Sequence, residues 1–210
     1  MQNNTIFVLL AGGKSERMGV AKGLLKYKHT FWILEQLNRI SKSTISEVYI
    51  GLGYNYKHYF DAIPWFKKAL NKTVDFLGLK VKIAINDTPE LGSFSTLQIV
   101  LKEIDSPNAV VINPIDTPLL NSADLNKIIF TKNEIVIPSF EEKNGHPIKV
   151  NSAIWNNLVS LNPTEKDARL DVQLKKLNPL KISIIEVSDR AILYNLNTKK
   201  EWISFLDSTN

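Results

Sequence analysis

The 210-residue sequence contains no cysteine. Disulfide bonds, thiolate nucleophiles and zinc–thiolate sites are therefore excluded. A long apolar run is also missing, and the chain begins with the polar stretch Gln2-Asn3-Asn4, so the sequence has neither the pattern of a signal peptide nor that of a membrane span. Low-complexity stretches rich in proline, glycine or serine are absent as well. We therefore expect a cytoplasmic globular protein without membrane contact.

Concentrated charge of one sign is also lacking. The net charge is +5, from 26 Lys and Arg against 21 Asp and Glu. The lysines are scattered and form no basic block, so the charge does not indicate nucleic-acid binding. A positive balance suits an enzyme that acts on polyanions such as nucleotides, although solvation of the surface alone explains it as well.

Short apolar runs that predict β-strands alternate with longer segments of helical periodicity. The apolar runs are 6–10, 47–52, 81–85, 109–112, 135–137, 148–150 and 182–187. The amphipathic segments are 31–40, 59–70, 96–104, 122–130 and 199–206. This alternation predicts a mostly parallel sheet covered by helices on both faces, and the length favours a single domain over residues 1–210.

In an open sheet of this kind, ligands bind outside the carboxyl ends of the strands. Polar or glycine residues follow three of the apolar runs at this position: Gly12-Gly13, Asn86 and Asp116. Asp116 lies between two prolines, which restrict the backbone around it. We therefore expect these residues to lie close together at one edge of the sheet, although an Asx turn would also explain Asp116.

The segment after the first run has the features of a phosphate site. The chain turns at Ala11-Gly12-Gly13, where two residues without a Cβ let backbone N–H groups approach an anion. Four basic residues follow within one short stretch: Lys14, Arg17, Lys22 and Lys26. The turn is neither a G-x-G-x-x-G dinucleotide fingerprint nor a Walker A loop, since the sequence contains neither motif.

Residues 12–25 fit the pattern G-G-x-S-x-R-M-G-x-x-K-x-L-L. This pattern resembles the nucleotidyltransferases of the molybdenum cofactor, the guanylyltransferases and cytidylyltransferases with a MobA-like NTP-transferase domain. The resemblance implies a three-layer α/β/α, Rossmann-like fold with a mostly parallel mixed sheet. It also implies Mg²⁺-dependent transfer of the nucleoside monophosphate of GTP or CTP to a phosphate monoester, foremost molybdopterin, with release of pyrophosphate.

The resemblance also assigns residues to roles. It implies that Lys22, Arg17 and Asp116 are catalytic and that the metal ligands are Asp116, Asn195 and Asn197. The nucleotide would contact Leu10, Ala11, Gly12, Gly13, Lys14, Ser15, Arg17, Lys22, Asn86 and Ser95. The segment 115–120 matches the family's G-D-x-P-x-L except that Ile115 replaces the glycine, and Lys199-Lys200 stand where the family has Pro-Glu.

Several alternatives remain open on the sequence alone. In this family Ala-Gly-Gly at the turn favours GTP, whereas Ser95 and His146-Pro147 resemble the cytidylyltransferase branch. The acceptor could instead be a sugar phosphate or a phospho-alcohol, or the chain could be a catalytically decayed nucleotide-binding protein. Asn197 or Thr198 could simply cap the last helix. In the same way, hydroxyl residues within 93–96 could cap the helix that follows the third strand. We expect a monomer or a weak homo-oligomer.

Overall fold

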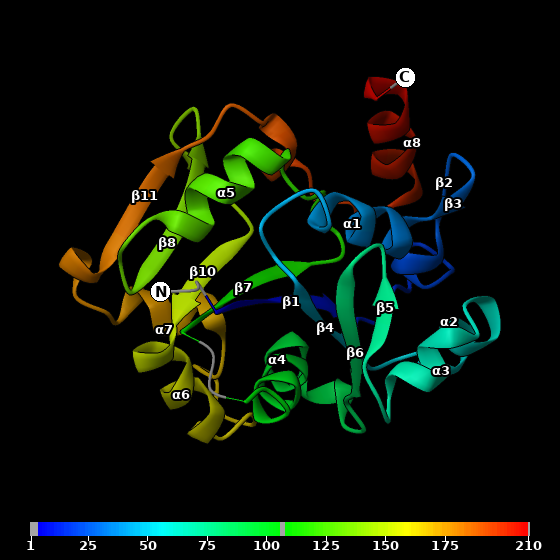
Figure 1. Cartoon of the computed structure of the whole chain (residues 1–210), viewed down its shortest axis with the longest axis horizontal. Helices are drawn as coiled ribbons and strands as arrows, with labels where there is room; N and C mark the ends of the chain where they lie inside the picture. Colours follow the sequence, from blue (N-terminus) through cyan, green and yellow to red (C-terminus); the bar gives the residue numbers. More distant parts are fainter. Residues whose placement is uncertain (1–3, 106–107, 210) are drawn as a thin grey trace.

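A nine-stranded sheet forms the centre of the computed structural model, which describes residues 4–105 and 108–209. Its strand order is β11-β8-β10-β7-β1-β4-β6-β5, and β9 pairs with β8 (Figure 1). The strands are β1 Thr5–Ala11, β4 Glu47–Leu52, β5 Val74–Phe76, β6 Leu79–Ile85, β7 Ala109–Pro114, β8 Ile135–Phe140, β9 Lys143–Asn144, β10 Ile148–Asn151 and β11 Ile182–Glu186. Strands β7, β1, β4 and β6 are parallel, whereas β10 and β5 run antiparallel to their neighbours. The predicted mostly parallel, mixed sheet is therefore confirmed.

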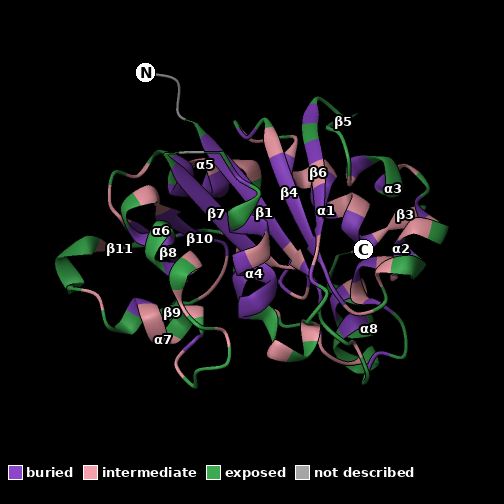
Figure 2. Ribbon diagram, turned by 90° about the horizontal axis from the view of Figure 1, so that it is seen from below, coloured by how far each residue is buried: buried purple, intermediate pink, exposed green. Residues whose placement is uncertain are grey.

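Helices cover both faces of the sheet, as predicted. The residues of β1 alternate between two hydrophobic cores, with Phe7 and Leu9 in one and Ile6 and Val8 in the other. The first core is covered by α1 Trp32–Ile40, α2 Tyr56–Ala62, α3 Trp65–Ala69, α5 Ser122–Phe130 and α8 Lys199–Ser208. The second is covered by α4 Ser93–Lys102, α6 Ser152–Ser160 and α7 Leu170–Lys175. The middle strands are buried over most of their length (Figure 2).

Short elements connect the main ones. They are the hairpin β2 Lys26–Tyr27 with β3 Thr30–Phe31 and the 3₁₀ turns η1 Lys22–Leu24, η2 Pro89–Leu91, η3 Pro179–Lys181 and η4 Arg190–Leu193. Among the residues that the structure describes, no helix combines the length and the apolarity needed to cross a bilayer.

One predicted helix is wrong. Residues 59–70 form parts of two helices, because the chain leaves helical geometry at Ile63, where φ is −133° and ψ is 81°. Pro64 follows, and a proline disfavours helical geometry in the residue before it. The helix then restarts at Trp65. The sequence prediction also omitted α6, α7, β5, β9 and the β2–β3 hairpin.

Candidate functional site

The glycine turn leaves the carboxyl end of β1 and folds into a compact loop. Ser15 has a positive φ of 58°, and its carbonyl accepts hydrogen bonds from the backbone N–H groups of Met18 and Gly19. The Ser15 hydroxyl accepts the backbone N–H of Lys22 at 3.2 Å. These bonds fix the loop against η1, so the backbone of Lys22 lies directly beside the turn.

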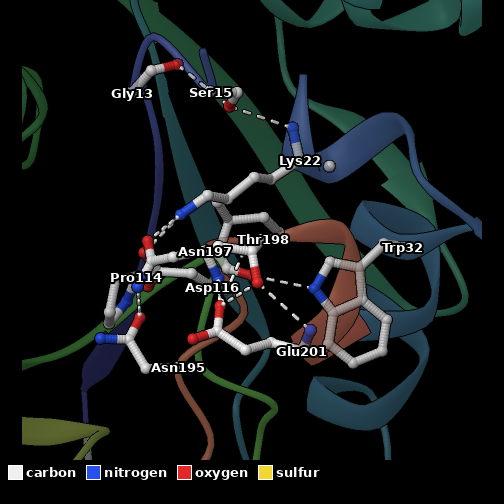
Figure 3. Close-up of polar contacts among 12 residues, drawn as sticks. Gly13, Ser15, Lys22, Trp32, Pro114, Asp116, Asn195, Asn197, Thr198 and Glu201 are labelled. Atoms are coloured by element: carbon white, nitrogen blue, oxygen red, sulfur yellow. Dashed lines mark hydrogen bonds and ion pairs between the residues drawn. The ribbon is translucent and has the colours of Figure 1, made fainter. Parts of the chain in front are cut away.

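Lys22 joins three segments that are far apart in the sequence (Figure 3). Its ammonium nitrogen lies 2.8 Å from Oδ2 of Asp116 and 2.6 Å from Oδ1 of Asn197. The side chains of Lys22 and Asp116 are only 13% and 25% exposed. A carboxylate oxygen and an amide oxygen therefore converge on one cationic position that is partly shielded from water.

Asp116 is held at the end of β7 by contacts of its backbone. The neighbouring Ile115 accepts a hydrogen bond at its carbonyl from the indole N–H of Trp32, at 2.8 Å, and donates its N–H to Leu10. The carbonyl of Asp116 itself accepts the N–H of Leu196 at 2.8 Å. The C-terminal segment is thereby fastened next to the carboxylate.

Asn197 is presented by the start of α8. Thr198 is the N-cap of this helix and forms a capping box with Glu201, which confirms the capping alternative for Thr198 and leaves the Asn197 side chain for the site. Oε2 of Glu201 accepts the backbone N–H groups of Asn197 and Thr198 at 2.8 and 2.7 Å. These hydrogen bonds lower the pKa of Glu201, and the bond from the Asn197 N–H has the largest effect. Asn195 is exposed, and its amide oxygen accepts a bond from the Asn197 amide.

Asn86 lies behind the site rather than in it. It follows β6 and is buried, and its amide N–H₂ donates to the hydroxyls of Ser95 and Thr96 at 2.8 and 2.9 Å. Its oxygen accepts from Thr88. No side chain caps α4, which has Gly92 as its N-cap, so the expectation of a hydroxyl cap there is wrong. Asn86 instead orients Thr96 toward the glycine turn.

The packing of Gly12 accounts for its lack of a side chain. A Cβ at this position would lie 2.8 Å from Oγ1 of Thr96 and 3.3 Å from the backbone nitrogen of Gly53. Gly53 is equally close, since its own Cβ would lie 2.8 Å from the carbonyl oxygen of Gly12. The turn therefore packs tightly against α4 and against the segment after β4.

The loop, Lys22 and Asp116 surround a cavity of about 530 Å³. Ten of the residues predicted for the site line it: Leu10, Ala11, Gly12, Gly13, Lys14, Ser15, Arg17, Lys22, Asp116 and Asn197. Asn86, Ser95 and Asn195 are not among the lining residues. The structure thus gathers most of the predicted residues around one cavity, while Asn86 and Ser95 are buried behind it and Asn195 is exposed beside Asn197.

Several lining residues were missed by the sequence prediction. They include Tyr54, Pro89, Glu90, Ser93 and Pro114. Tyr54 comes just after β4, so the rule that ligands lie at the carboxyl ends of parallel strands could have identified it. The Lys14 ammonium lies 5.9 Å from the Tyr54 ring centre and pairs with Glu16. The hydrogen bond between Lys14 and Glu16 raises the pKa of Lys14.

A second cavity, of about 560 Å³, adjoins the first. Leu10, Gly92, Ser93 and Pro114 line both cavities. Most of the other residues that line the second cavity are apolar, and His146, Arg169 and Asp171 add polar and charged groups. Burial lowers the pKa of His146, which favours its neutral form. His146 therefore adds no fixed positive charge to this cavity at neutral pH.

Comparison with known proteins gives a family and a fold. The family model of the MobA-like NTP transferase domain matches residues 7–178. A molybdenum cofactor guanylyltransferase from Xanthomonas euvesicatoria pv. vesicatoria (strain 85-10) is 24% identical over 195 residues, which cover 93% of this chain and 90% of that protein.

Solved structures share the architecture at low sequence identity. Rv0371c from Mycobacterium tuberculosis H37Rv has a TM-score of 0.77 with 19% identity, over 99% of each chain. A nucleotidyl transferase from Methanothermobacter thermautotroptrophicus has a TM-score of 0.78 with 17% identity, over 99% of this chain and 100% of that one. A complex of Rv0371c with manganese has a TM-score of 0.72 with 18% identity, over 98% and 99%.

Proposed function

Because the chain belongs to the MobA-like NTP transferase family, and is therefore a nucleotidyltransferase, we propose that it transfers GMP from GTP to molybdopterin with the help of Mg²⁺. The observation that carries the proposal is the convergence of Lys22, Asp116 and Asn197 beside the glycine turn. GTP is favoured over CTP by Ala11-Gly12-Gly13 and by the guanylyltransferase among the relatives.

The donor atoms fit a magnesium ion. Oδ2 of Asp116 and Oδ1 of Asn197 converge on a single cation, and oxygen is the ligand that Mg²⁺ prefers. Among residues 4–105 and 108–209, no cluster of three or more His, Cys, Asp or Glu side chains could hold a metal. Mg²⁺ commonly keeps several waters and takes further ligands from substrate phosphates, so this small donor set suffices. Asn195 would act by orienting Asn197.

The residues of the chain mainly position the substrates and neutralise the negative charge of their phosphates. The N–H groups of the turn and the side chains of Lys14 and Arg17 would hold the β- and γ-phosphates, and Lys22 would neutralise the α-phosphate. Mg²⁺, when bound, supplies charge neutralisation between phosphate oxygens. An oxygen of the acceptor phosphate attacks the α-phosphorus of the nucleotide and forms a new P–O bond. The bond between the α-phosphorus and the bridging oxygen of the pyrophosphate breaks, and pyrophosphate leaves with that oxygen. No side-chain base is needed, because the acceptor phosphate is already anionic near neutral pH.

The second cavity offers a place for the body of the acceptor. It opens from the nucleotide cavity beside Pro114, close to Asp116 in the chain. An acceptor seated there would direct its phosphate toward Lys22. Its walls combine aliphatic side chains with His146, Arg169 and Asp171, so it can hold an acceptor body that has both apolar and polar parts.

Thermal unfolding with GTP, CTP, ATP and UTP, each with and without Mg²⁺, tests the choice of nucleotide. A ligand that binds only the folded state stabilises it by about 2.7 kcal/mol at a hundred times Kd. We expect a Mg²⁺-dependent rise in Tm that is largest with GTP. A rise selective for CTP would replace GTP in the proposal, and no rise with any nucleotide would contradict it.

A further inference from the structure

The two oxygens proposed as metal ligands already have a cationic partner within the chain. The ammonium of Lys22 binds Asp116 and Asn197, which lie 94 and 175 positions away in the sequence. Figure 3 shows the Lys22 side chain extending from the loop to this pair of oxygens. A divalent cation that used the same oxygens would lie where the ammonium lies.

The ammonium and a divalent cation exclude each other at this position. Both are positive, and the Lys22 and Asp116 side chains are partly shielded from water. Repulsion between two cations is stronger in such a place than in bulk water. A divalent ion can therefore bind Asp116 and Asn197 tightly only when the ammonium of Lys22 moves away.

The backbone of Lys22 is fixed, so that only its side chain can make this move. Its N–H donates to Ser15, and the next N–H, of Gly23, donates to the hydroxyl of buried Tyr59 at 3.2 Å. Tyr59 packs so closely that a Cβ on Gly23 would lie 2.7 Å from its hydroxyl oxygen. The flexible four-carbon stem of lysine can still swing the ammonium. Its new partner must lie within the same cavity.

A triphosphate offers that partner. The glycine turn, Lys14 and Arg17 line the same cavity as Lys22, and phosphate oxygens bound there would attract the ammonium. We propose that Lys22 is the internal counter-ion of Asp116 and Asn197, and that the triphosphate draws it away and so opens these oxygens to the divalent metal. This inference rests on the proposed metal-dependent transfer. It adds that the protein binds the metal weakly until the nucleotide arrives.

Binding of Mn²⁺ alone, measured by electron paramagnetic resonance without nucleotide, tests this exchange. Lys22→Met removes the competing ammonium, so we expect it to bind Mn²⁺ about tenfold more tightly than the wild type, or better, within the usual range of such coupling. The double variant Lys22→Met/Asp116→Asn should lose this gain, which would locate the ion at Asp116. Circular dichroism verifies that each variant is folded.

Lys14→Met is the matched control. It removes an ammonium from the same cavity, but Lys14 pairs with Glu16 rather than with Asp116. It should bind Mn²⁺ within about twofold of the wild type. Equal tightening in both single variants, or no tightening in Lys22→Met, would overturn the inference. If that happened while the wild type still showed a Mg²⁺-dependent Tm rise with GTP, only the exchange would be wrong. If the rise were missing as well, the proposed function would fail.

Discussion

Single side chains connect the segments of this site. Lys22 links the glycine turn to Asp116 and Asn197. Trp32 contributes from outside the cavity, since its indole N–H fixes the carbonyl of the residue before Asp116. The charge of the site and its shape therefore depend on a few contacts between residues that are distant in the sequence.

Replacing Lys22 with alanine should impair catalysis more than binding. Negative charge shifts onto the leaving pyrophosphate as the bond to the α-phosphorus breaks, so a cation at this position acts mainly in the transition state. We expect kcat to fall about 100-fold or more, with a smaller loss of GTP affinity measured by calorimetry. A loss of GTP affinity with kcat unchanged would instead assign Lys22 to binding alone. Lys14→Ala, at the exposed rim, should show the smaller loss of kcat.

Gly12→Ala tests the packing of the turn. The added methyl group would meet the side chain of Thr96, so we expect a loss of about 1–3 kcal/mol in the free energy of unfolding. Thr96→Ala removes the atoms in conflict, and the double variant should therefore be more stable than the sum of the two single effects predicts. Urea unfolding measures all three variants. If the two single effects on the free energy of unfolding simply added in the double variant, contact with Thr96 would not be the reason that position 12 excludes a side chain.

At the scale of elements, the C-terminal segment is as important as the loop after β1. Helix α8 docks on α1 through an aromatic cluster in which Trp32 lies 5.3 Å from both Trp202 and Phe205, measured between ring centres. The capping box then fixes where α8 begins. Together these contacts determine where Asn197 lies relative to Asp116.

Asp124 in α5 anchors the turn between β11 and η4, which precedes α8 in the chain. Its Oδ2 accepts the backbone N–H groups of Ser188 and Asp189 and the hydroxyl of Ser188. Burial raises the pKa of Asp124, but hydrogen bonds from Ser188, Lys127 and Asn121 outweigh burial and lower it overall. The ionised form is thus stabilised in the folded state. Its contribution to stability is present above the unfolded pKa, about 3.9, and is lost as the pH falls through the lower folded value.

Asp124→Asn should therefore be destabilising in a pH-dependent way. We expect the free energy of unfolding at pH 7 to fall by about 2–4 kcal/mol, because buried donors lose a charged acceptor. The gap between wild type and variant should narrow as the pH falls below the unfolded pKa of about 3.9 toward the lower folded value, because the wild-type carboxylate then takes up a proton. Urea unfolding at pH 7 and at a series of acidic pH values measures the gap, and a gap that does not change with pH would contradict this role.

At the scale of the whole molecule, the sequence was most informative where the physics is local. The alternation of apolar runs and amphipathic segments predicted the sheet and its two layers of helices. The rule for parallel strands then placed Gly12 and Asp116 at one edge, and the structure brings them to the same cavity. The family pattern, confirmed by the family match, added the nucleotide chemistry. That residues 1–210 form a single domain remains our prediction.

The sequence was least informative where tertiary contacts decide. Asn86 follows a strand as an active-site residue would, yet its amide is used to hold Ser95 and Thr96. Asn195 and Asn197 are equivalent as residue types, and only the docking of α8 makes Asn197 the one that contacts Lys22. Their local sequence carries no sign of these partners, which come from distant parts of the chain.

Transfer of radiolabelled GMP from α-labelled GTP to molybdopterin tests the proposed reaction most directly. The wild type should attach the label to the acceptor and release one pyrophosphate for each GMP transferred, only when Mg²⁺ is present. Asp116→Ala should abolish the transfer, because it removes the only carboxylate proposed to bind the metal. Binding of GTP with Mg²⁺ but no transfer by the wild type would contradict the proposed reaction and indicate a nucleotide-binding protein. Transfer at the wild-type rate by Asp116→Ala would contradict the metal site.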